Sequence, residues 1–187
     1  MMKLRLFLAK IEDISESPET VMERMPEPRR VRFTEFRLPE QRLEYAASSL
    51  ALERAAACLA PGKLGSFRYD EAGRPCIDGL CVSLSHSAGF AVCAAGEIPL
   101  GVDIERRDRP LSEGMLRRFG SLDGFIALEA CVKLTGEGLG AGMNRYRLDG
   151  DVMLGPDGAA VARVWLGDIG AHRVCVCCAG DFCVEIN

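Results

Sequence analysis

The chain has 187 residues, of which 48% are hydrophobic and 27% are charged, and its formal net charge is −4 at neutral pH. This composition is typical of a globular protein and too apolar for a disordered one. The length accommodates one medium domain or two small, tightly joined halves. The negative charge argues against a nucleic-acid partner, because general nucleic-acid binders usually carry a basic excess. It does not exclude a local basic pocket.

The N-terminal segment predicts a strand and not a membrane anchor. Its first ten residues hold one short apolar stretch interrupted by Lys3 and Arg5, far below the roughly 20 apolar residues of a spanning helix. Residues 4–11 alternate as a strand does. The segment also lacks the apolar region of a signal peptide, so we expect a cytoplasmic protein with no membrane partner.

The nine cysteines are expected to be structural and reduced, as is usual in the cytoplasm. Four of them lie among Val, Ala and Phe near the C-terminus, where they resemble small buried hydrophobic residues: Cys175, Cys177, Cys178 and Cys183.

The first third of the chain predicts a loop followed by a long helix. Polar residues 12–30 contain three prolines and predict a loop with short helical turns. Residues 40–59 contain no helix breaker and place apolar residues at helical spacing, which predicts a helix. Four arginines form a basic run between these segments: Arg29, Arg30, Arg32 and Arg37.

The remainder predicts strands, then helices, then strands. A turn at Gly73-Arg74-Pro75 precedes expected strands over residues 81–85, 90–95 and 100–105, and expected helices over residues 111–119 and 124–135. Four glycines predict a flexible loop over residues 136–142, and residues 146–186 predict antiparallel strands. This order indicates an α+β fold. We expect two similar α/β halves, 1–98 and 99–187, joined near residues 96–99.

The first candidate site is the segment Gly101-Val102-Asp103-Ile104-Glu105. Side chains alternate along a strand, so Asp103 and Glu105 point to one face. Two adjacent carboxylates on an otherwise apolar strand repel each other, and a cation between them relieves the repulsion. Oxygen ligands favour Mg²⁺ or Mn²⁺. The alternative is a solvent-exposed strand face beside Arg106 and Arg107.

The second candidate is the pair Glu129 and Lys133, which a spacing of four places on one face of the expected helix. The alternative is an ordinary surface ion pair, worth a few tenths of a kcal/mol. Because the neighbouring residues are apolar, we expect the pair to line a pocket.

The third candidate is Ser85-His86-Ser87 at the end of an expected strand, where hydroxyls and an imidazole can hydrogen-bond a phosphate. A hydrolase nucleophile is the weaker alternative, because no Gly-x-Ser-x-Gly motif is present. Six arginines could together hold a multiply phosphorylated ligand, although each alone predicts solvated surface. They are Arg29, Arg30, Arg32, Arg37, Arg42 and Arg74.

In combination these motifs resemble those of the surfactin-synthetase-type 4′-phosphopantetheinyl transferases. In that family a Gly-Lys-Pro turn precedes Ser-His-Ser, then Gly-[Ile/Val]-Asp-[Ile/Val]-Glu, and last a motif with Trp, Lys-Glu and a further Lys. The order and approximate gaps agree over residues 29–139. The last motif is matched here by Phe125, Leu128, Glu129 and Lys133, followed by Gly136-Glu137-Gly138-Leu139.

The resemblance implies a monomer of two similar halves related by pseudo-twofold symmetry. It implies transfer of phosphopantetheine from coenzyme A to a serine of an acyl or peptidyl carrier protein, as in fatty-acid, polyketide or nonribosomal-peptide synthesis. Mg²⁺ would be held by Asp103, Glu105 and Glu129. Glu129 or a metal-bound water would accept the serine proton, and Lys133 would stabilise the transferred phosphate. The phosphates of coenzyme A would be held by Arg42, Arg74, Ser85 and His86.

Three departures from the family pattern bear on activity. Arg74 replaces the usual lysine and keeps its charge, whereas Phe125 and Leu128 replace the usual tryptophan and lysine. The segment 119–125, which helps form the carrier-protein surface in relatives, is shorter than usual. Two other interpretations therefore stay open: a non-catalytic binder of coenzyme A or a carrier protein, and a metal-dependent phosphodiesterase or nuclease. The first two motifs favour the transferase over the nuclease.

Overall fold

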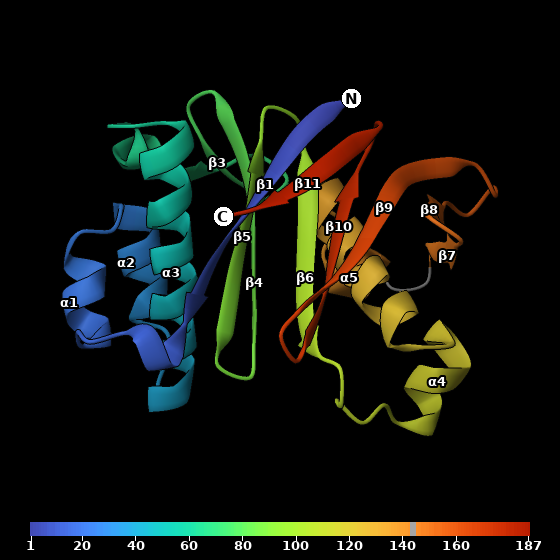
Figure 1. Ribbon diagram of the computed structural model, residues 1–187, viewed down its shortest axis with the longest axis horizontal. Helices are drawn as coiled ribbons and strands as arrows, with labels where there is room; N and C mark the ends of the chain where they lie inside the picture. Colours follow the sequence, from blue (N-terminus) through green and yellow to red (C-terminus); the bar gives the residue numbers. More distant parts are fainter. Residues whose placement is uncertain (143–144) are drawn as a thin grey trace.

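The computed structural model describes residues 1–142 and 145–187. Two β-sheets stand side by side at its centre, and helices cover their outer faces (Figure 1). This arrangement confirms the expected α+β class. Within the described residues, no helix combines the length and apolar character needed to cross a bilayer.

The first sheet has six strands, antiparallel except at one edge, where β11 runs parallel to β1. In sheet order its strands are β11 (Phe182–Ile186), β1 (Met2–Lys10), β5 (Phe90–Gly96), β4 (Leu80–Ser87), β3 (Pro75–Ile77) and β2 (Arg68–Tyr69). The prediction that the C-terminal tail forms only antiparallel strands is therefore wrong for β11, which returns to the N-terminal strand.

The second sheet has five strands, and every neighbouring pair is antiparallel. In sheet order they are β6 (Leu100–Arg106), β10 (His172–Cys178), β9 (Ala160–Ile169), β8 (Val152–Leu154) and β7 (Arg147–Asp149). The strands expected over residues 81–85, 90–95 and 100–105 are confirmed as β4, β5 and β6, with slightly wider bounds.

One long helix packs on each sheet, with shorter helices beside it (Figure 1). On the first sheet lies α3 (Pro39–Leu59), with α1 (Pro18–Glu23) and α2 (Glu27–Phe33) against it, and on the second lies α5 (Leu122–Thr135), with α4 (Glu113–Phe119) against it. Short 3-10 turns occupy Ile11–Asp13 and Leu64–Ser66. The predicted loop over residues 136–142 is partly wrong, because α6 (Leu139–Gly142) forms a short helix after two left-handed glycines, Gly136 and Gly138.

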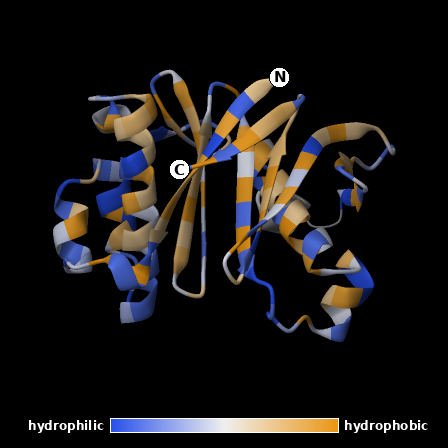
Figure 2. Ribbon diagram, in the orientation of Figure 1, coloured by the Kyte–Doolittle hydropathy of each residue, from blue (hydrophilic) through white to orange (hydrophobic). Residues whose placement is uncertain are grey.

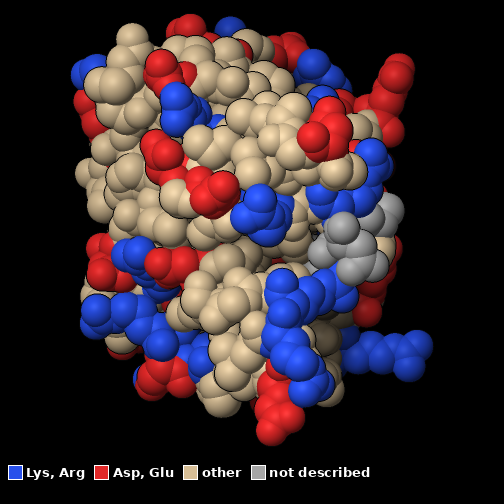
Figure 3. Space-filling model, turned by 90° about the vertical axis from the view of Figure 1, so that its right-hand side faces the viewer, with Lys and Arg blue, Asp and Glu red and all other residues tan. Residues whose placement is uncertain are grey.

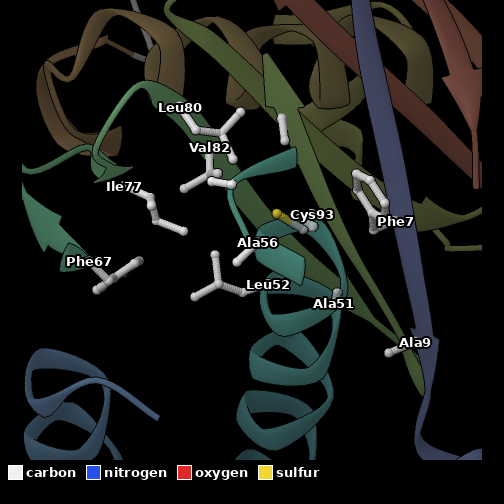
Figure 4. Close-up of a cluster of buried hydrophobic side chains, with 13 residues drawn as sticks. Phe7, Ala9, Ala51, Leu52, Ala56, Phe67, Ile77, Leu80, Val82 and Cys93 are labelled. Atoms are coloured by element: carbon white, nitrogen blue, oxygen red, sulfur yellow. The ribbon is translucent and has the colours of Figure 1, made fainter. Parts of the chain in front are cut away.

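Four apolar clusters hold the structure together, and three of them involve the sheets. The first lies between α3 and the first sheet, where Leu52 meets Ile77, Leu80 and Val82 (Figure 4). The second lies between α5 and the second sheet. The third joins the two sheets through strands β1, β5, β6 and β10. Figure 2 shows the difference between central strands: β5 is apolar over nearly its full length, whereas β6 carries polar positions.

Strands β4 and β6 lie next to each other although they belong to different sheets. The Val102 backbone N–H donates to Ser83 Oγ at 3.0 Å across this junction. Two further serines of β4 face acidic residues of β6, as described below. The junction therefore places the Ser-His-Ser motif beside the Asp-x-Glu motif.

Candidate functional site

A cavity of about 460 Å³ opens beside the junction between the two sheets. Its walls come from α2, α3, the turn before β3, strand β4 and the C-terminal end of α5. Its basic lining residues are Arg29, Arg32, Arg74, His86 and Lys133. No Asp or Glu is among the described residues that line it. The cavity is therefore suited to an anionic ligand even though the chain is acidic overall.

Arg29 is the most deeply placed of these cations, with only 3% of its surface exposed. Its guanidinium lies 3.8 Å from the ring centre of Tyr45, and its Nη2 donates to Ser48 Oγ and Ser49 Oγ, both at 2.7 Å. All of these partners are neutral, and Nε has no hydrogen-bond partner. Burial lowers the pKa of Arg29, so a bound anion would stabilise its charged form.

Arg74 and His86 occupy the wall formed by the first sheet. Asp70 orients Arg74 by accepting from its Nε at 2.8 Å, and Arg74 Nη1 donates to the Leu134 carbonyl at the end of α5. His86 Nδ1 lies 3.3 Å from Glu44 Oε2. Burial lowers the pKa of His86 despite this carboxylate.

Lys133 connects the cavity to the buried acid of β6. Its Nζ donates to Asp103 Oδ1 at 2.7 Å and to the Val102 carbonyl at 3.0 Å. The Ser85 hydroxyl donates to the same Asp103 oxygen at 2.7 Å. Asp103 is only 2% exposed, so the alternative of a solvated strand face is wrong for this residue.

The two acids of β6 do point to one face, as predicted, because both accept hydrogen bonds from serines of β4. Glu105 Oε2 accepts from the Ser87 hydroxyl at 2.5 Å. Its other oxygen, Oε1, forms an ion pair with Arg109, which lies four residues further along the chain. Both carboxylates are thus held in position by neighbouring side chains.

Glu129 differs from Asp103 and Glu105 because its carboxyl forms no ion pair with a described residue, whereas Asp103 pairs with Lys133 and Glu105 with Arg109. Burial, followed by the negative charge of Asp103, raises the pKa of Glu129 to about 7. Of the two residues expected to line a pocket, Lys133 lines the cavity, whereas Glu129 is not among its described lining residues. Lys133 makes its ion pair with Asp103, so the alternative of an ordinary Glu129–Lys133 surface pair is wrong. Glu129 is consequently able to gain or lose a proton near neutral pH.

The acidic residues carry oxygen donors of the kind that bind Mg²⁺. Asp103 Oδ2 is buried without a hydrogen-bond partner, and the negative charge of Asp103 contributes to the raised pKa of Glu129. Carboxylate oxygens are the hard donors that Mg²⁺ prefers. The third acid, Glu105, is occupied by Arg109. In residues 1–142 and 145–187, no three His, Cys, Asp or Glu side chains are arranged as a ready metal group. The chemistry of these donors suits Mg²⁺, but Asp103 is engaged by Lys133 and Glu105 by Arg109.

Two predicted ligand-binding residues lie outside the cavity lining. Ser85 is turned toward Asp103. Arg42 pairs with Glu19 at 3.0 Å and donates to the Phe36 carbonyl. Conversely, Tyr45 and Tyr69 line the cavity but were not expected there. The spacing of aromatic residues in a sequence is the same for a pocket wall and for a core, so it could not have predicted these positions.

Phe125 and Leu128, at the positions where the family that the motifs resemble has tryptophan and lysine, are both core residues here. Phe125 is 5% exposed and Leu128 is 3% exposed, and both belong to the cluster between α5 and the second sheet. Arg109 lies 4.8 Å from the ring centre of Phe125. Neither side chain lines the cationic cavity, so the cavity keeps its charge without that lysine.

Comparison with known proteins adds no identification to this geometry. No protein-family model matches the chain, and a search of curated proteins found no match.

Proposed function

We propose that the protein is a 4′-phosphopantetheinyl transferase that moves phosphopantetheine from coenzyme A to a serine of an acyl or peptidyl carrier protein. The observation that carries this proposal is the direct link from a cationic cavity to a buried carboxylate, made by Lys133 and Asp103. Coenzyme A carries a 3′-phosphate and a pyrophosphate, so it needs cations for binding. When the serine hydroxyl attacks the pyrophosphate, negative charge develops there, so a charge-stabilising site is needed next to the binding cations.

The sheet orders support two halves related by pseudo-twofold symmetry. In the first sheet the strands from β1 to β2 follow the order β1-β5-β4-β3-β2. In the second they follow β6-β10-β9-β8-β7, which is the same order with each number raised by five. One long helix accompanies each set, α3 in the first and α5 in the second. The proposed ligand cavity receives residues from both halves.

In this proposal the cations of the cavity bind the phosphates of coenzyme A. Arg29, Arg32 and Arg74 would contact phosphate oxygens through guanidinium groups, which suit bidentate binding. His86 would become protonated when a phosphate approaches, because the anion favours the charged imidazole. Lys133 would neutralise charge on the transferred phosphate while holding Asp103 in place.

Asp103 and Glu129, joined by Glu105 when Arg109 releases it, would hold Mg²⁺. When bound, the ion would neutralise the pyrophosphate charge during serine attack. Glu129 would accept the serine proton. Val102 and Ile104, both fully buried, anchor the strand that carries the two acids of β6.

Basic groups on one face of the molecule support an acidic protein partner. Figure 3 shows Lys and Arg side chains, with Asp and Glu side chains among them, on the lower half of the face that carries α4 and the second sheet. On α4, Leu116 is 45% exposed, and the last turn carries Arg117 and Arg118. Carrier proteins of this pathway class are acidic, so a face that combines basic and apolar groups would complement them.

The test is intact-protein mass spectrometry of an apo carrier protein incubated with this protein, coenzyme A and Mg²⁺. We expect the carrier to gain one phosphopantetheine. The gain should be lost with Glu129→Gln and retained with Glu12→Gln, a matched change at an exposed side chain far from the cavity. Absence of transfer to both a fatty-acid carrier and a peptidyl carrier would refute the enzymatic proposal.

A non-catalytic binder of coenzyme A is the second candidate, favoured by the engagement of Glu105 with Arg109. It shares the cationic cavity but needs no metal. It predicts coenzyme A binding that chelation leaves unchanged, together with no modified carrier. The same mass-spectrometric experiment, run beside calorimetry of coenzyme A binding, separates the two candidates.

A further inference from the structure

The hairpin of β3 and β4 places two cysteines directly opposite each other. Cys76 is the register partner of Cys81, and Ile77 pairs with Leu80 at the two-residue turn. A pair that closes a two-residue turn is hydrogen-bonded, so the next pair outward is of the non-hydrogen-bonded kind. The Cα atoms of such a pair lie about 4.5 Å apart, which is within the range that a disulfide spans.

Both thiols lie on the face of this hairpin that points away from α3. Ile77 and Leu80 point toward α3, as Figure 4 shows. Because side chains alternate along a strand, Cys76 and Cys81 point to the opposite face. Neither cysteine is fully buried. The partner of Cys81 on its other side is Gly96, which has no side chain to cover the Cys81 sulfur.

The other cysteines of the described chain do not share this arrangement. Cys175 and Cys178 have the two-residue spacing of redox motifs, but strand β10 turns them to opposite faces, into two different apolar clusters. Cys175 and Cys177 share a face with their sulfur atoms 4.0 Å apart, yet both are completely buried. No second cross-strand pair of cysteines occurs in the described strands.

We propose that Cys76 and Cys81 are an oxidisable dithiol that closes to a disulfide by exchange with a low-molecular-weight disulfide such as glutathione disulfide. The Cys76 thiolate attacks one sulfur of that reagent, forms a mixed disulfide and releases one thiol. The Cys81 thiolate then attacks the Cys76 sulfur and releases the second thiol. Two protein thiols are oxidised, the reagent is reduced to two thiols, and the two protein protons pass to the released thiolates.

The order of attack follows from the surroundings of the two thiols. Burial, followed by the proximity of Cys76, raises the pKa of Cys81, so Cys81 is the poorer first nucleophile at neutral pH. Cys76 Sγ lies 3.6 Å from the Arg68 carbonyl at the edge of the sheet, where a reagent can approach. This proposal is independent of the proposed transferase function, because it uses no residue of the acidic site.

The experiment treats the folded protein with glutathione disulfide, blocks remaining thiols by alkylation and digests the product without reduction. Cleavage before Asp70, Asp78 and Asp103 separates the two cysteines into peptides 70–77 and 78–102. We expect these peptides to be joined, with a mass two hydrogen atoms below their sum, and to separate on reduction. Fragmentation should place the link at Cys81 and not at Cys93, the other cysteine of the second peptide.

Variants then test the mechanism. Cys81→Ser should stop the reaction at a stable mixed disulfide on Cys76, whereas Cys183→Ser, a matched change at another partly exposed thiol, should leave the cross-link unchanged. The proposal is overturned if the wild-type protein shows no link between the peptides. It is equally overturned if the link runs through Cys93 or if glutathione stays attached to Cys76 in the wild-type chain.

Discussion

At the scale of single residues, Glu129 gives the most direct test of the site's electrostatics. Its pKa rises from the ordinary value of 4.5 to about 7, mainly because burial disfavours the charged carboxylate. The folded state therefore holds the proton more tightly than the unfolded state. The wild-type protein loses stability as pH rises from about 4.5 through 7, and this loss is complete above that window.

We therefore predict that Glu129→Gln stabilises the metal-free protein at pH 8 by about 1–2 kcal/mol, after allowance for partial solvent exposure. The advantage should shrink as pH falls and vanish near pH 4.5. Urea unfolding across this pH range, with a chelator present, measures the difference. Glu12→Gln serves as the control and should show no such trend, because the Glu12 side chain is 75% exposed.

Two neighbouring arginines of α2 test whether the cavity binds an anion. Arg32 and Arg30 are both exposed, but of the two only Arg32 is among the described residues that line the cavity. We expect Arg32→Ala to weaken coenzyme A binding about tenfold through loss of a charge-assisted hydrogen bond, and Arg30→Ala to leave it unchanged. Calorimetry measures both. Equal losses in the two variants would mean that general surface charge, and not the cavity, governs affinity.

The sequence predicted the shared face of Asp103 and Glu105, because strand alternation depends only on neighbouring residues. It did not predict the partner of Lys133. Helical spacing favoured Glu129, but the packing of α5 on β6 brings the lysine to Asp103, 30 residues away. The burial of Arg29 was likewise not predicted from the sequence, since its serine partners lie about 20 residues further along the chain.

At the scale of elements, the packing of α5 on β6 depends on one glycine. A Cβ atom on Gly101 would lie 1.9 Å from the Ala130 carbonyl oxygen and 2.7 Å from the Leu134 backbone nitrogen. Both obstacles are backbone atoms, which cannot turn aside as a flexible side chain can. Glycine is thus required here for close approach of the strand and the helix.

We predict that Gly101→Ala destabilises the fold by about 3 kcal/mol or more, through overpacking against the helix backbone. The matched control is Gly65→Ala, where a Cβ would meet nothing within 4 Å and the backbone is not left-handed. Denaturant unfolding of the two variants checks the prediction. A Gly101→Ala protein as stable as the control would show that α5 and β6 are not in close contact.

Elements were predictable from the sequence where their signals are local. The helix expected over residues 40–59 forms over Pro39–Leu59, because a long run without breakers and with regular apolar spacing has few alternatives. Strands β2 and β3 have only two and three residues, too few to show alternation. The parallel pairing of β11 with β1 joins residues about 180 positions apart, and no local pattern carries such information.

At the scale of the whole molecule, the two halves share a core. The cluster between the sheets combines Leu4, Leu6 and Val92 from the first half with Val102 and Val174 from the second. Strand β11 also links the sheets, because the chain leaves the second sheet after β10 and pairs through β11 with β1 of the first sheet. Opening either half would expose apolar surface of the other, so we expect the two to unfold together.

Leu52→Ala tests this cooperativity, because Leu52 is fully buried in a cluster made only of first-half residues. The single tryptophan, Trp165, lies in the second half and packs against the shared core. If the molecule unfolds as one unit, removing the Leu52 side chain should lower the stability reported by Trp165 fluorescence by about 2–5 kcal/mol. The helical circular dichroism signal should shift by the same amount. Independent halves would instead leave the Trp165 transition in place while helix α3 is lost at lower denaturant.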